Sequence, residues 1–216
     1  MNVEKIKVLD RSHLEFVLRG HLIPYKLWGK GFARNVDQLY EEIRQGKSRL
    51  EVHEHKLARV LHESIVQAYI PIYKDIWHRL LKHHRVLPNG KTEKFRRQMG
   101  LSTSILRRET EWNAARRVIR DVLEVTVVPQ LHDLTPKDID PLTRMTRQKP
   151  QPEFDSLQYP GLLSLFYRYE FACLLPPNWI TKTHHRHTEP DKTIVTFLLR
   201  PVKKEEVPPD IRQNGH

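Results

Sequence analysis

The chain has 216 residues, a length that fits one domain with a substantial core and leaves little room for a second. Its single cysteine, Cys173, excludes an intramolecular disulfide, and the surrounding apolar run FACLL predicts a buried, unreactive thiol. A formal net charge of +11 favours partners that carry phosphate groups, although a basic solvated surface has the same composition.

The sequence lacks the signals of a membrane-spanning helix, of a signal peptide and of the common nucleic-acid-binding motifs. No apolar run approaches the roughly 20 residues of a membrane-spanning helix, so we expect no membrane span. The N-terminus carries Glu4, Asp10 and Glu15 and has no apolar signal core, which makes a cytoplasmic location the default expectation, with an organelle left open. The absence of an RGG run, zinc-finger spacing or an RNP-like motif leaves nucleic-acid binding as one alternative among several.

The first predicted element is a short helix that follows an apolar but irregular lead. Asn35 is a favourable N-cap, Gln38 stands three residues later in capping-box register, and Gly46 supplies a stop. Leu39 and Ile43 fall on one side of this helix. We therefore expect a docking helix.

Strand patterns begin directly after this helix. Residues 49–54 (RLEVHE) and 56–62 (KLARVLH) flank a turn-like stretch, and residues 64–73 form an apolar, β-branched and aromatic run. A sheet is expected to begin here.

A hairpin is predicted around Pro88-Asn89-Gly90, a turn signal that places Val86 and Phe95 on opposing arms. The preceding residues 75–84, DIWHRLLKHH, fit the start of a helix equally well. Both assignments stay open at this point.

The strongest helix signals lie in residues 103–125, TSILRRETEWNAARRVIRDVLEV. Thr110 can cap the N-terminus of this helix. Apolar side chains recur at helical spacing, at Trp112, Ala115, Ile119 and Val122. The helix should pack against the sheet.

The C-terminal half alternates between strand composition and irregular segments. Residues 125–131 have strand composition, and residues 134–155 are rich in proline and charge without a sustained period, which predicts a long surface loop. Strand composition returns in residues 162–175 and 193–199. The tail from Pro201 onward is proline-rich and charged and is expected to be disordered.

Mixed strands with one helix in front and one in the middle predict an α+β or α/β fold. The expected organisation is an N-terminal extension with the short helix over residues 1–48, a domain over residues 49–200 and the charged tail over residues 201–216.

The helical segment 103–125 resembles a Nudix box, the loop-helix-loop motif of the Nudix superfamily. Glu109 falls on the first glutamate of the motif, Arg117 follows after the required seven residues, and Asp121 replaces one of the paired acids. Apolar places of the motif fall on Ile119 and Val125.

Other places of the motif depart from the pattern. Thr103 stands for the first glycine and Glu124 for the last, while Val118 and Val122 stand for two glutamates. Of the three helix positions at which the pattern places acids, only position 121 keeps one.

Three further segments resemble a group of Nudix-like proteins. They are Trp28–Val52, Tyr159–Leu162 with the FYRYEFACLLP that follows, and Glu189–Phe197. This resemblance extends from Trp28 to Arg200 and implies a Nudix-like mixed sheet sandwiched between helices, with an N-terminal helical extension.

For an active enzyme, the resemblance implies a Mg²⁺- or Mn²⁺-dependent hydrolase of a nucleoside diphosphate derivative. Glu109 and Asp121 would hold the metal, and Arg117 would orient an acid or a phosphate. An ion pair between Arg117 and Asp121 would compete with the metal. We therefore favour a domain that binds its ligand with weak catalysis or none and requires no cofactor, with the hydrolase as the alternative.

Arginines surround the box and suit phosphate oxygens geometrically. The candidate phosphate-binding residues are Arg107, Arg108, Arg116 and Arg120. The same arginines fit solvent-facing helix positions equally well. The expected partner is a phosphate-containing small molecule or a protein, and a basic nucleic-acid-binding module is the second alternative.

One further cluster combines imidazoles and carboxylates in residues 183–191, THHRHTEPD. Such groups can bind zinc or another transition metal. The members are His184, His185, His187, Glu189 and Asp191. Because no cysteine is near and a strand is predicted to follow, we favour a solvated loop over a metal site.

Overall fold

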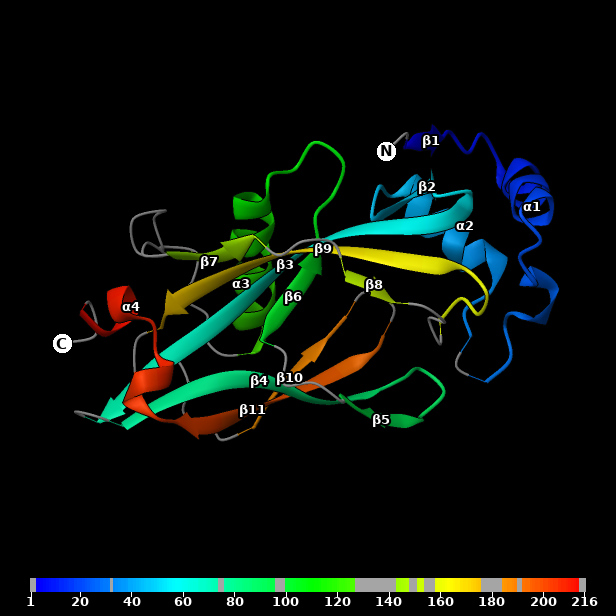
Figure 1. Cartoon of the computed structure of the whole chain (residues 1–216). Helices are drawn as coiled ribbons and strands as arrows, with labels where there is room; N and C mark the ends of the chain where they lie inside the picture. Colours follow the sequence, from blue (N-terminus) through cyan, green and yellow to red (C-terminus); the bar gives the residue numbers. More distant parts are fainter. Residues whose placement is uncertain are drawn as a thin grey trace. The chain divides into compact units, whose positions relative to one another are not determined.

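A computed structural model of the chain combines a large, mainly antiparallel sheet with few helices, which is an α+β fold (Figure 1). The structure describes residues 3–31, 33–73, 76–95, 100–126, 143–147, 151–153, 158–175, 184–189 and 192–213. No helix among these residues has the length and apolar character that crossing a membrane requires. The finer expectation of a Nudix-like sandwich stays a prediction.

The strands are β1 (Glu4–Ile6), β2 (Ser48–His53), β3 (Lys56–Tyr73), β4 (Ile76–Val86), β5 (Thr92–Lys94), β6 (Leu101–Ser104), β7 (Thr143–Arg147), β8 (Gln151–Glu153), β9 (Leu163–Leu174), β10 (His184–Thr188) and β11 (Ile194–Val202). The helices are α1 (Arg11–Gly20), α2 (Val36–Arg44), α3 (Glu111–Thr126) and α4 (Pro209–Gln213), with the 3₁₀ turns η1 (Tyr25–Leu27) and η4 (Lys204–Glu206). Strands pair in the order β1-β2-β3-β4-β11-β10; β5 pairs with β4, β6 and β9 pair with β3, and β7 and β8 pair with β9.

The chain divides into two compact units, each drawn from segments far apart in sequence. Unit 1 comprises Met1–Glu63, Ser104–Glu111 and Gln148–Arg168. Unit 2 comprises Ser64–Thr103, Trp112–Arg147 and Tyr169–His216. The domain boundaries expected from the sequence are not tested by this division and stay predictions.

In unit 1, α2 begins and ends at the residues that the sequence predicts. The Asn35 side chain accepts a hydrogen bond from the backbone N–H of Gln38 at 2.9 Å, and the Gln38 side chain accepts one from the N–H of Asn35, also at 2.9 Å. Gly46 follows the helix with φ of 70°. The capping box and the stop are confirmed.

Helix α1 was not predicted, although its signals are local. The Asp10 side chain accepts from the N–H of His13 at 2.7 Å, and Leu14 and Leu18 are fully buried one turn apart.

The hairpin between β2 and β3 is confirmed, with Glu54 and His55 both at positive φ, as a two-residue turn requires.

A buried carboxylate, Glu42 on α2, collects hydrogen bonds from much of unit 1. It accepts from Arg59 of β3 at 2.6 and 2.9 Å, from Arg34 at 2.5 Å and from the Tyr159 hydroxyl at 2.9 Å. Burial and the Glu42 charge raise the pKa of the Tyr159 hydroxyl, so it stays a donor. These four residues are defined as the Glu42 network.

The segment around Trp28 docks on the segment that precedes β9. The Trp28 indole N–H donates to the carbonyl of Pro160 at 2.9 Å, and its ring meets the Tyr159 ring edge-on at 5.1 Å. Gly161 has φ of 82°, and a Cβ there would lie 2.6 Å from Cδ of Pro24. Two of the segments that carry the family resemblance are therefore in direct contact.

In unit 2, α3 packs on the sheet through the predicted stripe. The helix begins directly after Thr110, and Ala115, Ile119 and Val122 are buried in one cluster with residues of β3, β4, β6, β9 and β11. Trp112 packs against Phe171 with ring centroids 4.9 Å apart. The predicted packing is confirmed.

Cys173 lies in the same cluster. It is 1% exposed, and burial raises the pKa of its thiol to about 12. The expected buried thiol is confirmed.

The hairpin around Pro88-Asn89-Gly90 is confirmed, and the helical alternative for the preceding segment is wrong. Val86 pairs with Thr92, and the N–H of Phe95 donates to the carbonyl of His83 at 3.2 Å. Pairing of β4 with both β3 and β11 supplies backbone partners that a helical turn would forgo.

The strand expected over residues 125–131 and the loop expected over residues 134–155 are wrong where the structure describes them. Residues 125 and 126 belong to α3 instead of a strand, while 127–131 lie outside the described residues. Strands β7 and β8 occupy parts of the expected loop because they pair with β9, and the rest of residues 134–155 lies outside the described residues.

The charged tail is ordered over residues 201–213, contrary to the expected disorder. Strand β11 continues to Val202, and η4 and α4 follow. Val207 and Ile211 are buried against Trp77 and Tyr69, and this apolar contact fixes the segment in spite of its charge.

Substitution of Glu42 tests how far unit 1 depends on the Glu42 network. Glu42→Ala leaves the Arg59 guanidinium, whose side chain is 4% exposed, without its carboxylate. Breaking a buried pair in this way costs about 3 to 5 kcal/mol of unfolding free energy, which urea denaturation measures. The neighbouring Glu41→Ala, which removes an exposed pair with Arg44 and an exposed hydrogen bond from Gln45, is the matched control and should resemble the parent protein. Equal effects of the two substitutions would contradict the prediction.

Candidate functional site

Five cationic side chains line one cavity in unit 1. The cavity, called the basic pocket here, has a volume of about 570 Å³. Its cationic lining consists of Lys7, Lys47, Arg49, Arg107 and Arg108, and His62 adds an imidazole. Glu109 is the acidic residue among its lining. Such a pocket attracts anions.

The turn before α3 supplies two of these cations in a fixed backbone conformation. Arg107 and Arg108 are exposed, and Arg108 adopts φ of 69°, a left-handed conformation that costs energy for a residue with a side chain. The N–H of Ile105 donates to the carbonyl of His62 at 2.8 Å, so the turn is tied to β3.

Glu109 closes this turn with its own carboxylate. One carboxylate oxygen accepts from the N–H of Leu106 at 2.9 Å, and the N–H of Glu109 donates to the carbonyl of Leu106 at 3.0 Å. The carboxylate is therefore engaged in holding the two arginines that precede it.

Gly46, at the end of α2, allows the turn to approach. Its φ is 70°, and a Cβ at this position would lie 2.8 Å from Cβ of Arg107. Only glycine combines this conformation with this contact. The short predicted helix thereby contributes to the pocket.

His62 presents a mainly uncharged ring to the pocket at neutral pH. Its ring stacks on Tyr167 with centroids 4.7 Å apart and planes 7° apart. Burial and the nearby Arg49 charge lower the pKa of His62, and Glu51 opposes them. Arg49 itself pairs with Glu51 at 2.6 Å, so its charge is partly balanced.

The other predicted site residues lie on α3, in unit 2. Asp121 lies 3.4 Å from Arg120, and Arg117 donates to the Thr103 hydroxyl at 3.1 Å. Arg116 is half-buried and Arg120 exposed. The structure thus gathers Arg107, Arg108 and Glu109 around one pocket and keeps the remaining four on the helix.

The two valines of the box face hydrocarbon. Val118 and Val122 are each 6% exposed and belong to the core cluster of unit 2. Mg²⁺ and Mn²⁺ prefer several oxygen ligands, and among the three helix positions of the motif only Asp121 supplies a carboxylate. Within the described part of the chain, no three His, Cys, Asp or Glu side chains are grouped as metal ligands. The described donor set does not fit the metal centre that the resemblance implies.

The histidine-rich segment is a strand and not the expected loop. Residues His184–Thr188 form β10, which pairs with β11. The backbone hydrogen bonds of this pairing outweigh the polar composition of the segment. Burial lowers the pKa of His187, and the Glu189 and Asp121 charges oppose this. The side chains of His184 and His185, and all of Asp191, lie outside the described residues, and the metal-site alternative stays untested.

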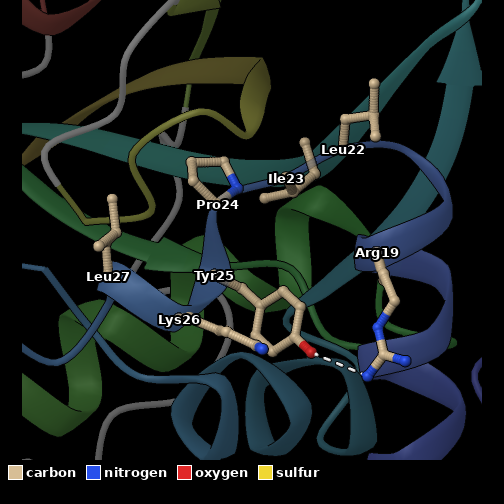
Figure 2. A pocket seen from close by; sticks show the side chains of 7 residues that line it. All are labelled: Arg19, Leu22, Ile23, Pro24, Tyr25, Lys26 and Leu27. Carbon is tan, nitrogen blue, oxygen red and sulfur yellow. Dashed lines mark hydrogen bonds between the residues drawn. The ribbon is translucent and has the colours of Figure 1, made fainter.

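A second hollow, of about 410 Å³, lies beside η1 (Figure 2). Leu22, Ile23, Pro24 and Leu27 supply its apolar side chains, and the Tyr25 hydroxyl accepts a hydrogen bond from Arg19 at 3.4 Å. Leu22 is 90% exposed and has φ of 57°. An exposed leucine in a left-handed conformation contributes little to stability.

No model of a known protein family matches the chain, and no curated protein matches it either. The resemblance to Nudix proteins therefore stays a prediction, and the geometry of the two units is the ground for assigning a function.

Four basic residues of the pocket were missed at the sequence level: Lys7, Lys47, Arg49 and His62. They come from three segments that only the folded chain brings together. Lys47 and Arg49 alternate at the start of a predicted strand beside Gly46, which was the one local signal for them.

Alanine at Gly46 tests the close approach of the turn. Gly46→Ala forces a left-handed alanine, which costs about 1 to 2 kcal/mol, and also displaces Arg107. Gly90→Ala is the matched control, because Gly90 has φ of 80° with no atom within 4 Å of the added Cβ. Urea denaturation should show a larger loss for Gly46→Ala. Equal losses would show that the contact with Arg107 does not matter.

Glycine at Leu22 tests whether this residue serves stability. Leu22→Gly relieves left-handed strain of about 1 kcal/mol, which offsets the added freedom of the unfolded chain. We expect the melting temperature to stay equal or to rise. A clear decrease would mean that the Leu22 side chain stabilises the fold despite its exposure.

Proposed function

We propose that the chain is a Nudix-fold protein that binds a phosphate-containing ligand in the basic pocket and does not hydrolyse it. The observation that carries the proposal is the convergence of five lysine and arginine side chains on one cavity. Arginine forks bind phosphate oxygens through paired hydrogen bonds, and neighbouring cations add to the attraction.

Two features support the proposed Nudix-like sandwich. The apolar stripe of the box helix packs on the sheet of unit 2. In unit 1, Trp28 contacts Tyr159 and Pro160, which belong to the two segments whose resemblance is independent of the box.

The absence of turnover rests on the carboxylates. Val118 and Val122 lie in the core, Glu109 accepts from Leu106, and Asp121 faces Arg120. The alternative, a Mg²⁺- or Mn²⁺-dependent hydrolase, requires both carboxylates to leave these partners and to meet at one metal ion.

Calorimetric titration with pyrophosphate tests the binding proposal. Each lost arginine removes charged hydrogen bonds, so Arg107→Ala and Arg108→Ala should each weaken binding about tenfold. Arg44→Ala is the matched control, because Arg44 is an exposed arginine paired with Glu41 and does not line the pocket. Affinity should fall as salt is added.

Other outcomes of the titration would contradict the proposal. Absence of pyrophosphate binding at millimolar concentration would refute it. A greater loss of pyrophosphate affinity in Arg116→Ala or Arg120→Ala would show that the binding site lies on α3 and not in the basic pocket. Release of a nucleoside monophosphate from nucleoside diphosphate derivatives with Mg²⁺ or Mn²⁺, abolished by Asp121→Ala, would establish the hydrolase alternative.

A further inference from the structure

Aliphatic side chains also line the basic pocket. Its apolar lining consists of Ile6, Val8, Ile43, Val60, Ile105 and Leu106. All except Val60 are only partly buried, so they leave hydrocarbon in contact with water inside the cavity. A ligand that covers this surface gains roughly 25 cal/mol for each Å² of apolar area removed from water.

Aromatic side chains are missing from this wall. Among the described residues that line the pocket, none is Phe, Tyr or Trp, and the one ring is the imidazole of His62. One face of that ring already stacks on Tyr167. Proteins bind exposed nucleobases largely by stacking them on aromatic rings. The lining therefore favours a flexible hydrocarbon over a base.

Cationic and aliphatic side chains alternate within the same short segments. Ile105 and Leu106 directly precede Arg107 and Arg108, and Lys7 stands between Ile6 and Val8. A single ligand can therefore touch both kinds of side chain. The volume of about 570 Å³ lies within the range of small-molecule sites.

We propose that the ligand of the basic pocket is an aliphatic phosphate or diphosphate ester. The arginines and lysines bind its phosphate groups, and the aliphatic wall covers its hydrocarbon. This inference rests on the proposed function, because it requires that phosphate binds in this pocket. The ester is either a free small molecule or the head and first methylenes of an anionic lipid.

Titration with three probes separates the two proposals. Geranyl diphosphate, held below the concentration at which it forms micelles, should bind at least tenfold tighter than pyrophosphate, the gain that burial of about two methylene groups gives. It should also bind tighter than ADP. If pyrophosphate binds and geranyl diphosphate binds no tighter, the aliphatic ligand is refuted while the proposed function stands. If pyrophosphate does not bind, the proposed function fails, and this inference fails with it.

Variants assign the phosphate and hydrocarbon parts of the ligand to the cationic and aliphatic side chains of the pocket. Ile105→Ser should reduce the preference for geranyl diphosphate over pyrophosphate to near one. Ile72→Ser is the matched control, because Ile72 is an exposed aliphatic residue of unit 2, 47% exposed. Arg107→Ala should weaken both probes in equal proportion. If neither Arg107→Ala nor Ile105→Ser changes the affinity for geranyl diphosphate, the inference is overturned. Leu106→Ser replaces Ile105→Ser if the latter fails to fold.

Vesicles identify the source of the ester. Binding to phosphatidylcholine vesicles that contain phosphatidic acid, but not to phosphatidylcholine alone, and its loss in Ile105→Ser, would identify a lipid. Binding of free geranyl diphosphate without vesicle binding would identify a soluble ester.

Discussion

Unit 1 depends on a carboxylate that is taken out of water and then fully supplied with donors. Glu42 is 7% exposed, and it meets the guanidinium of Arg59, a second arginine and the hydroxyl of Tyr159. A buried charge is tolerated only when its partners are arranged around it. Since these partners come from β3, from the loop before α2 and from the segment before β9, one side chain determines how three separate parts of unit 1 meet.

The position of the basic pocket follows from this arrangement. Fixing Glu42 fixes α2, and α2 ends at Gly46, where the turn with Arg107 packs closest. Lys47 and Arg49 follow Gly46 directly along the chain, and both line the pocket. The packing of the end of α2 against the turn with Arg107 therefore holds these cations near one another, because like charges repel and another interaction has to offset the repulsion.

The sequence predicts those elements whose signals are local. The capping box of Asn35 and Gln38, the two hairpin turns and the stripe of α3 each lie within a few residues, and each is confirmed. Strand β10 forms by pairing with β11, the next strand along the chain, and helix α4 by burial against the distant Trp77. Both contacts outweigh a polar or charged composition, which is the signal that the sequence offers at these positions. The pocket, too, depends on contacts between distant segments. Arg107 could be predicted from the motif around it, whereas Lys7 becomes a pocket residue only because the fold brings it to the same cavity as Arg107, 100 residues later.

The hydroxyl that completes the Glu42 network stands 117 residues further along the chain. At a synthesis rate of about 5 to 20 residues per second, roughly 6 to 23 seconds therefore pass between the addition of Glu42 and the addition of Tyr159. In that interval Trp28 also lacks the carbonyl of Pro160, and the leucines of α1 and α2 lack part of their cover. The nascent chain thus exposes apolar surface that the completed unit 1 buries.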